Sequence, residues 1–112
     1  VNNAGTSIYG KLVNLDIEDE KRLFDVNFWG VRHGCRVAVE ALKKYGGVII
    51  NVGSEVSERA IPLQGIYSAT KHAVKAYTEA LRVELEHDEL PIQVCLIRPT
   101  AINTPFPDHA AN

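Results

Sequence analysis

Tyr67 and Lys71 stand four residues apart in the stretch Tyr-Ser-Ala-Thr-Lys. If this stretch is helical, the two side chains share one face, so the ammonium lies near the phenolic oxygen. A nearby cation favours the phenolate and lowers the pKa of a tyrosine below its ordinary value of about 10. The pair is therefore a candidate proton donor and acceptor at neutral pH.

Ser54 stands thirteen residues before Tyr67, at the end of an apolar, β-branched run that predicts a buried strand. Ligands of open α/β sheets bind at the carboxyl ends of strands, where Ser54 and the helix-borne pair can meet. A serine that ends a strand can also simply satisfy a backbone group. The distance in sequence to Tyr67 favours the functional interpretation.

Asn27 falls inside a second predicted helix. Asparagine is intrinsically unfavourable there, which indicates a bend or a buried hydrogen bond. Such a structural role is compatible with a role in the site.

The elements that would position these residues alternate along the chain. Acidic residues at 16–20 suit a helix N-terminus, and the apolar residues from Leu23 to Leu42 recur at helical spacing before Gly46 and Gly47 end the helix. The remaining predicted elements are a strand over about 48–52, a loop over 54–64, a helix over about 65–89 and a strand over 92–97. This alternation favours an α/β fold with a parallel sheet and right-handed crossovers.

Taken in order, these landmarks resemble the short-chain dehydrogenase/reductase family from the first residue to about Phe106. The landmarks are Asn2-Asn3-Ala4-Gly5, Asn27, Ser54, the Tyr67 and Lys71 pair, and the Pro99 turn after the last strand. The resemblance implies a doubly wound parallel sheet of the Rossmann type. Residues 1–112 would then be the catalytic portion of an NAD(P)-binding domain that lacks the first βαβ units, because no Gly-rich phosphate turn is present.

The resemblance also implies an oxidoreductase that uses NAD or NADP to transfer a hydride to or from a small alcohol or carbonyl substrate. Ser54 would hold the substrate oxygen and Tyr67 would be the general acid or base. Lys71 would lower the tyrosine pKa and bind the nicotinamide ribose, and Asn27 would support a proton-relay water. The implied cofactor-binding residues are Asn3, Ala4, Gly5, Tyr67, Lys71, Pro99, Ile102 and Thr104.

One departure lies in the loop after the last strand. Thr100 follows Pro99, where family members usually have glycine, so the fine geometry of this loop should differ.

Two alternatives belong to other functional classes. One is a regulatory protein that binds nucleotide on the same fold without turnover. The other is a sugar-nucleotide epimerase or dehydratase, which shares the Tyr-x-x-x-Lys spacing. The Ser54 and Tyr67 pair favours an enzyme, and the Asn-Asn-Ala-Gly stretch favours the simpler dehydrogenase.

Composition excludes several partners. The chain has 46% hydrophobic and 23% charged residues and a formal net charge of −2, which is ordinary for a globular protein and unlike a nucleic-acid-binding one. It has no apolar run near the roughly 20 residues that cross a bilayer, so we expect no membrane partner and a cytoplasmic location. The histidines lack metal-ligand spacing, so no metal is expected. Cys35 and Cys95 are expected to be buried core residues without a disulfide.

Val1-Asn2-Asn3 is typical of the tail of a strand, so the chain is expected to be part of a longer protein and to be inactive alone. Both long helices also carry a second apolar surface. It comprises Phe28, Trp29, Val37, Tyr77, Val83 and Leu85. The resemblance implies that such helices pair with a second copy, which gives a homodimer or homotetramer. The alternative is that other parts of the same domain cover this surface.

Overall fold

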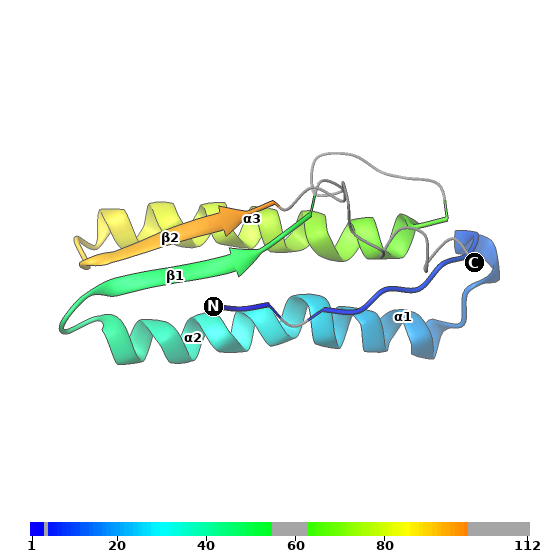
Figure 1. The fold of residues 1–112 in the computed structure, drawn as a ribbon, viewed down its shortest axis with the longest axis horizontal. Helices are drawn as coiled ribbons and strands as arrows, with labels where there is room; N and C mark the ends of the chain where they lie inside the picture. Colours follow the sequence, from blue (N-terminus) through cyan, green and yellow to red (C-terminus); the bar gives the residue numbers. More distant parts are fainter. Residues whose placement is uncertain (4, 55–62, 99–112) are drawn as a thin grey trace, which may run out of the picture.

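The computed structural model describes residues 1–3, 5–54 and 63–98. Its elements in chain order are η1 (Leu12–Asn14), α1 (Ile17–Phe24), η2 (Asp25–Trp29), α2 (Gly30–Leu42), β1 (Gly47–Val52), α3 (Gly65–His87) and β2 (Ile92–Ile97). The η2 segment is a π-helical turn, so α1, η2 and α2 form one continuous rod (Figure 1). The predicted order of helix, strand, helix and strand is confirmed, and α3 ends two residues earlier than expected.

The strands β1 and β2 run parallel, from the pair Gly47 and Ile92 to the pair Val52 and Ile97. On the other edge of β1, Asn2 forms an isolated parallel bridge with Asn51. The Asn2 amide donates to the Ile50 carbonyl at 2.8 Å, and the Val52 amide donates to the Asn2 carbonyl at 3.2 Å. The stretch around Asn2 therefore pairs with β1 as a neighbouring strand would.

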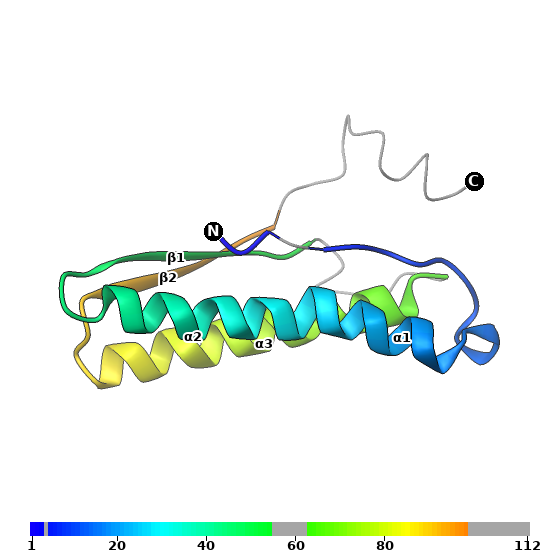
Figure 2. The same cartoon turned by 90° about the horizontal axis from the view of Figure 1, so that it is seen from below.

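The helical rod and α3 both cover the same side of the strands (Figure 2). The apolar core lies between the layer of helices and the layer of strands. It consists of Val31 and Cys35 from α2, Ile49 from β1, Val74 and Leu85 from α3, and Ile92 and Val94 from β2. The placement of Leu85 on an outer apolar surface was therefore wrong, since its side chain is only 5% exposed and packs in the core.

Local interactions explain where α1 begins and where the chain turns after α2. The Asp16 carboxylate accepts a hydrogen bond from the Glu18 amide at 2.7 Å and caps α1. Gly46 has a φ of +88°, and a Cβ there would lie 2.7 Å from the Pro91 carbonyl oxygen. Glycine is therefore required where the chain turns from α2 into β1.

A buried polar cluster joins the first residues to both helices. Its members are Asn2, Cys35, Asn51 and Thr78. Asn51 accepts from Asn2 Nδ2 at 2.8 Å and donates to Thr78 Oγ1 at 2.9 Å, and the Cys35 thiol lies 3.4–3.5 Å from the two carboxamides. Burial raises the pKa of the Cys35 thiol. Satisfied polar groups of this kind fix the relative placement of the elements they join.

Cys95 differs from the expectation, because its side chain on β2 is exposed. Both cysteines are free. None of the helices in the described ranges is long and apolar enough to span a membrane.

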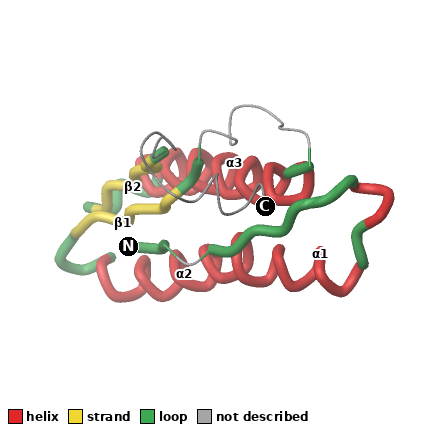
Figure 3. The backbone as a smooth tube through the Cα atoms, turned by 45° about the vertical axis from the view of Figure 1, so that its right-hand side comes forward, coloured by secondary structure: helices red, strands yellow, loops and turns green. Residues whose placement is uncertain are grey.

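After the stretch around Asn2, residues 5–11 form a loop that runs the length of α1 and reaches η1 (Figure 3). The loop is tied to the start of α3, because the Gly10 amide donates to the Leu63 carbonyl at 3.0 Å. This loop and the first turns of α3 surround the candidate site.

Candidate active site

Tyr67 and Lys71 lie on the first two turns of α3. The Lys71 Nζ is 5.8 Å from the centre of the Tyr67 ring. The ammonium also donates to the Val52 carbonyl at 3.3 Å, at the end of β1. Lys71 is only 5% exposed, and this burial lowers the pKa of its ammonium.

The pKa of Tyr67 is raised, because burial of the phenol disfavours its ionised form. A hydrogen bond with the Ser54 side chain acts in the opposite direction, and the nearby Tyr9 adds to the rise. The sequence-based prediction that the pKa of Tyr67 falls below its ordinary value is therefore contradicted. Desolvation outweighs the effect of neighbouring groups.

Ser54 stands two residues after the end of β1, and its side chain is hydrogen-bonded to Tyr67. The end of a strand and the start of the next helix thus bring together two residues that are thirteen positions apart. This is the crevice position that the α/β topology predicts for ligands.

Asn27 sits in the π-helical turn η2 and is fully buried. Its Oδ1 accepts from the Thr6 amide at 2.7 Å, and its Nδ2 donates to the Thr6 carbonyl at 2.8 Å. The same Nδ2 donates to Thr70 Oγ1 at 3.1 Å. The expectation of a bend or a buried hydrogen bond at Asn27 is confirmed by the hydrogen bond, and the helix around Asn27 is a π-helical turn.

Gly5 completes the group of neighbours. A Cβ built on Gly5 would lie 3.5 Å from both Lys71 Nζ and Asn27 Oδ1. The backbone of the loop therefore passes directly over the lysine and the asparagine. Asn3 is exposed beside the Asn2 bridge.

Four of the residues named as cofactor contacts lie outside the described residues. They are Ala4, Pro99, Ile102 and Thr104.

Thr70 and Tyr9 adjoin Tyr67, Gln64 is bonded to Tyr9, and none of the three was singled out from the sequence. Gln64, just before α3, donates through Nε2 to Tyr9 Oη. Thr70 donates to the Tyr67 carbonyl at 2.7 Å while it accepts from Asn27. Gln64 and Thr70 stand within three residues of Tyr67, which is a usable signal, whereas nothing in the sequence marks Tyr9.

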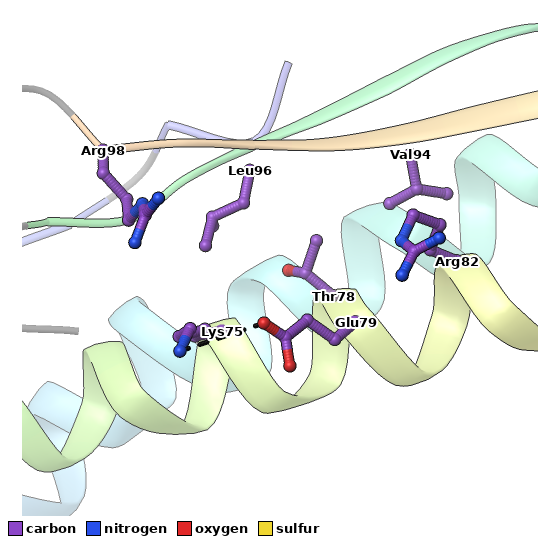
Figure 4. Close-up of a pocket in the computed structure, with 7 residues that line it drawn as sticks. All are labelled: Lys75, Thr78, Glu79, Arg82, Val94, Leu96 and Arg98. Carbon is purple, nitrogen blue, oxygen red and sulfur yellow. Dashed lines mark ion pairs between the residues drawn. The ribbon is translucent and has the colours of Figure 1, made fainter. Parts of the chain in front are cut away.

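A separate hollow of about 360 Å³ lies between α3 and β2, away from these residues. Its lining is Lys75, Thr78, Glu79, Arg82, Val94, Leu96 and Arg98 (Figure 4). Lys75 and Glu79, one turn apart on α3, form an ion pair at 3.9 Å along its wall (Figure 4). None of the candidate catalytic residues lines this hollow. Within residues 1–3, 5–54 and 63–98, no group of three or more His, Cys, Asp or Glu side chains could hold a metal ion.

The family model described as short chain dehydrogenase matches residues 1–111. The chain belongs to the short-chain dehydrogenase family. This membership supports the predicted fold class, a Rossmann-like parallel α/β sheet of which the described residues form a part.

Individual members of the family agree with this assignment. The uncharacterized oxidoreductase YxnA of Bacillus subtilis is 43% identical over 112 residues, which are 98% of this chain and 32% of that protein. A short-chain dehydrogenase/reductase from Burkholderia phymatum, solved in complex with NAD, superposes with a TM-score of 0.89 at 33% identity and covers 96% of this chain and 39% of that one.

An alcohol dehydrogenase from the archaeon Thermococcus sibiricus was solved with 5-hydroxy-NADP. It superposes with a TM-score of 0.83 at 30% identity and covers 93% of this chain and 43% of that one. The chain thus spans less than half the length of these three relatives. One of the two solved structures holds NAD and the other holds 5-hydroxy-NADP, which supports a nicotinamide cofactor for the family.

Proposed function

We propose that the complete protein is an NAD- or NADP-dependent oxidoreductase acting on a small alcohol or carbonyl substrate, with Tyr67 as its general acid or base. The observation that carries this proposal is the hydrogen bond between Ser54 and Tyr67 beside the buried ammonium of Lys71. A protein that only binds nucleotide has no need of a serine and a tyrosine paired in this way. The pairing therefore supports the enzyme over the regulatory alternative.

The residues present fit a nicotinamide cofactor. An ammonium has three N–H donors, and the Val52 carbonyl accepts one hydrogen bond from Lys71. Gly5 has no side chain to cover Lys71 Nζ, which a Cβ would approach to 3.5 Å. Lys71 could therefore hold the hydroxyl groups of a nicotinamide ribose, with the Gly5 backbone beside them. When bound, the nicotinamide supplies or accepts the hydride.

The protein side chains would manage the oxygen of the substrate and its proton. Ser54 would donate a hydrogen bond to the substrate oxygen and hold it near the phenol. Tyr67 would give its proton to that oxygen during carbonyl reduction and take it back during alcohol oxidation. A phenol is protonated at neutral pH at its ordinary pKa of about 10, and burial raises the pKa of Tyr67 further, so carbonyl reduction would start from the protonated form.

Asn27 would support the proton relay indirectly. Both hydrogens of its amide are donated within the protein, one to the Thr6 carbonyl and one to Thr70. We therefore propose that Asn27 acts through the shape of the π-helical turn rather than by donating its amide hydrogens to a relay water.

The test is to incubate the complete protein with NADH or NADPH and a panel of aldehydes and ketones, and to follow loss of the reduced cofactor by absorbance. Tyr67→Phe removes only the phenolic oxygen and should lower turnover by about 10²- to 10⁴-fold, the usual contribution of general acid–base catalysis. Cofactor affinity should be almost unchanged. Turnover of Tyr67→Phe near that of the wild type would contradict the assignment.

A further inference from the structure

Thr70 occupies a buried position between the residues of the proposed site. It follows Tyr67 by three residues and directly precedes Lys71, and its side chain is fully buried. Its hydroxyl donates to the Tyr67 carbonyl at 2.7 Å and accepts from Asn27 Nδ2 at 3.1 Å. One hydroxyl therefore joins the first turn of α3 to the π-helical turn of the neighbouring rod.

The two hydrogen bonds differ in origin. A threonine in a helix commonly donates to a carbonyl three or four residues earlier, so the bond to Tyr67 is a local one. The bond from Asn27 crosses 43 positions of sequence and is buried. Asn27 also holds both backbone groups of Thr6, in the loop that passes over Lys71. The continuous chain of hydrogen bonds runs from Thr6 through Asn27 and Thr70 to the backbone of Tyr67.

We propose that Thr70 is a positioning residue of the active site, whose hydroxyl fixes the helical turn bearing Tyr67 and Lys71 against Asn27 and the Thr6 loop. This inference rests on the proposed function and deepens it. Its physical basis is that a buried chain of satisfied hydrogen bonds is rigid. Loss of the central hydroxyl would free the turn and leave an Asn27 N–H without its acceptor. Displacements of about 1 Å at a catalytic group can cost on the order of 10²-fold in rate.

The competing explanation is that Thr70 only satisfies a buried polar group and contributes to stability. The chain offers a matched control for this possibility on the same helix. Thr78 is also buried, donates to the Val74 carbonyl at 2.7 Å and accepts from Asn51 Nδ2 at 2.9 Å. Thr78 thus makes the same two kinds of hydrogen bond as Thr70 and has no contact with Tyr67 or Lys71 among the interactions of the described residues.

The experiment compares Thr70→Val, Thr70→Ser and Thr78→Val in the complete protein, with Tyr67→Phe alongside. Thermal unfolding, kcat and KM are measured for each variant. The pKa of Tyr67 is read by NMR of ring-labelled tyrosine in the wild type and in the three threonine variants. Thr70→Val should lower kcat by about ten- to a hundred-fold. It should also raise the pKa of Tyr67, because a loosened phenol bonds less well to Ser54. Thr70→Ser, which keeps the hydroxyl, should restore both quantities, and Thr78→Val should lose melting temperature but keep kcat and the pKa.

Equal kcat and equal Tyr67 pKa in Thr70→Val and Thr78→Val would overturn the positioning role. If Thr70→Val does not fold, Thr70→Ala takes its place with the same criteria. The NMR measurement needs no turnover, so it tests the inference even if no substrate is found. Full activity of Tyr67→Phe would instead reject the proposed function, which separates the two failures.

Discussion

The Lys71 ammonium lies 5.8 Å from the centre of the Tyr67 ring and donates a hydrogen bond to the Val52 carbonyl at the end of β1. Helix α3 therefore places its cation between a strand end and a phenol. This position is more than 90% buried, which makes the charge costly unless it has a partner. A lysine at this position therefore favours a role in cofactor binding over a role in the stability of the fold.

Replacing this lysine tests that interpretation. Lys71→Met keeps the length of the stem and removes the charge. We expect cofactor dissociation constants to rise about ten- to a hundred-fold, the equivalent of one charged hydrogen bond of about 1.5–3 kcal/mol, with turnover reduced as well. Isothermal titration with NADH and NADPH measures the affinity. Lys75→Met, one turn further along α3 in an ion pair with Glu79, should bind cofactor normally. Unchanged affinity in Lys71→Met would contradict the ribose-binding role.

The hydrogen bond between Ser54 and Tyr67 leads to a prediction about pH. This bond lowers the pKa of Tyr67, although burial raises it overall. Ser54→Ala should therefore raise the pKa further. Alcohol oxidation needs the phenolate, so its rate should begin to rise at a higher pH than in the wild type. Carbonyl reduction needs the protonated phenol, so its loss of rate at alkaline pH should also move upward.

The pH profiles of kcat/KM in both directions provide this measurement. Ser68→Ala is the control, because the Ser68 hydroxyl is buried next to Tyr67 but has no hydrogen-bond partner in the described part of the chain. Its profile should match that of the wild type. A shift of the Ser54→Ala profile to lower pH would refute the assigned role of the bond.

Two glycines one turn apart on α2 predict opposite effects on stability. A Cβ on Gly34 would lie 2.0 Å from Asn2 Oδ1, so Gly34→Ala must push Asn2 away from Asn51. We expect a loss of about 1–3 kcal/mol in the free energy of unfolding. A Cβ on Gly30 meets its nearest atom at 3.6 Å, so Gly30→Ala should gain up to about 1 kcal/mol from helix propensity. Denaturant unfolding of both variants checks the sign, and equal effects would contradict this packing.

The periodic parts of the fold could be predicted from the sequence because they depend on local patterns. Apolar residues at helical spacing predict α3, and a short apolar, β-branched run predicts β2. The predicted and observed boundaries of β2 agree at both ends. The meeting of Ser54 with Tyr67 followed from the rule that ligands bind at strand ends.

The rest depended on contacts between distant segments. Thr70 bonds to a residue 43 positions away, and Tyr9 meets Gln64 across 55 positions. No local pattern encodes these distances. The raised pKa of Tyr67 was missed for a related reason, since the sequence shows a nearby lysine but not how much water the fold removes.

The outer faces of the helical rod and of α3 carry apolar side chains that the core does not use. Trp29 is 47% exposed and packs edge-on against Phe28, with ring centres 5.0 Å apart. Val37 and Val83 are 70% and 54% exposed. Phe28 and Tyr77 are partly buried against the core, so the surface proposed for self-association is narrower than the sequence predicted.

We propose that Trp29, Val37 and Val83 contact a second copy of the protein in a homodimer or homotetramer. Burial of a large apolar side chain contributes about 1.5–3 kcal/mol to the free energy of association, and each contact occurs twice across a two-fold axis. Trp29→Glu would place a charge in this contact and should convert the complete protein to monomers in analytical ultracentrifugation. Its circular dichroism should be unchanged, because Trp29 lies outside the core. Tyr45→Glu, an aromatic residue 84% exposed after the end of α2, should leave the mass of the assembly as it is. An unchanged mass for Trp29→Glu would show that other parts of the protein cover this surface.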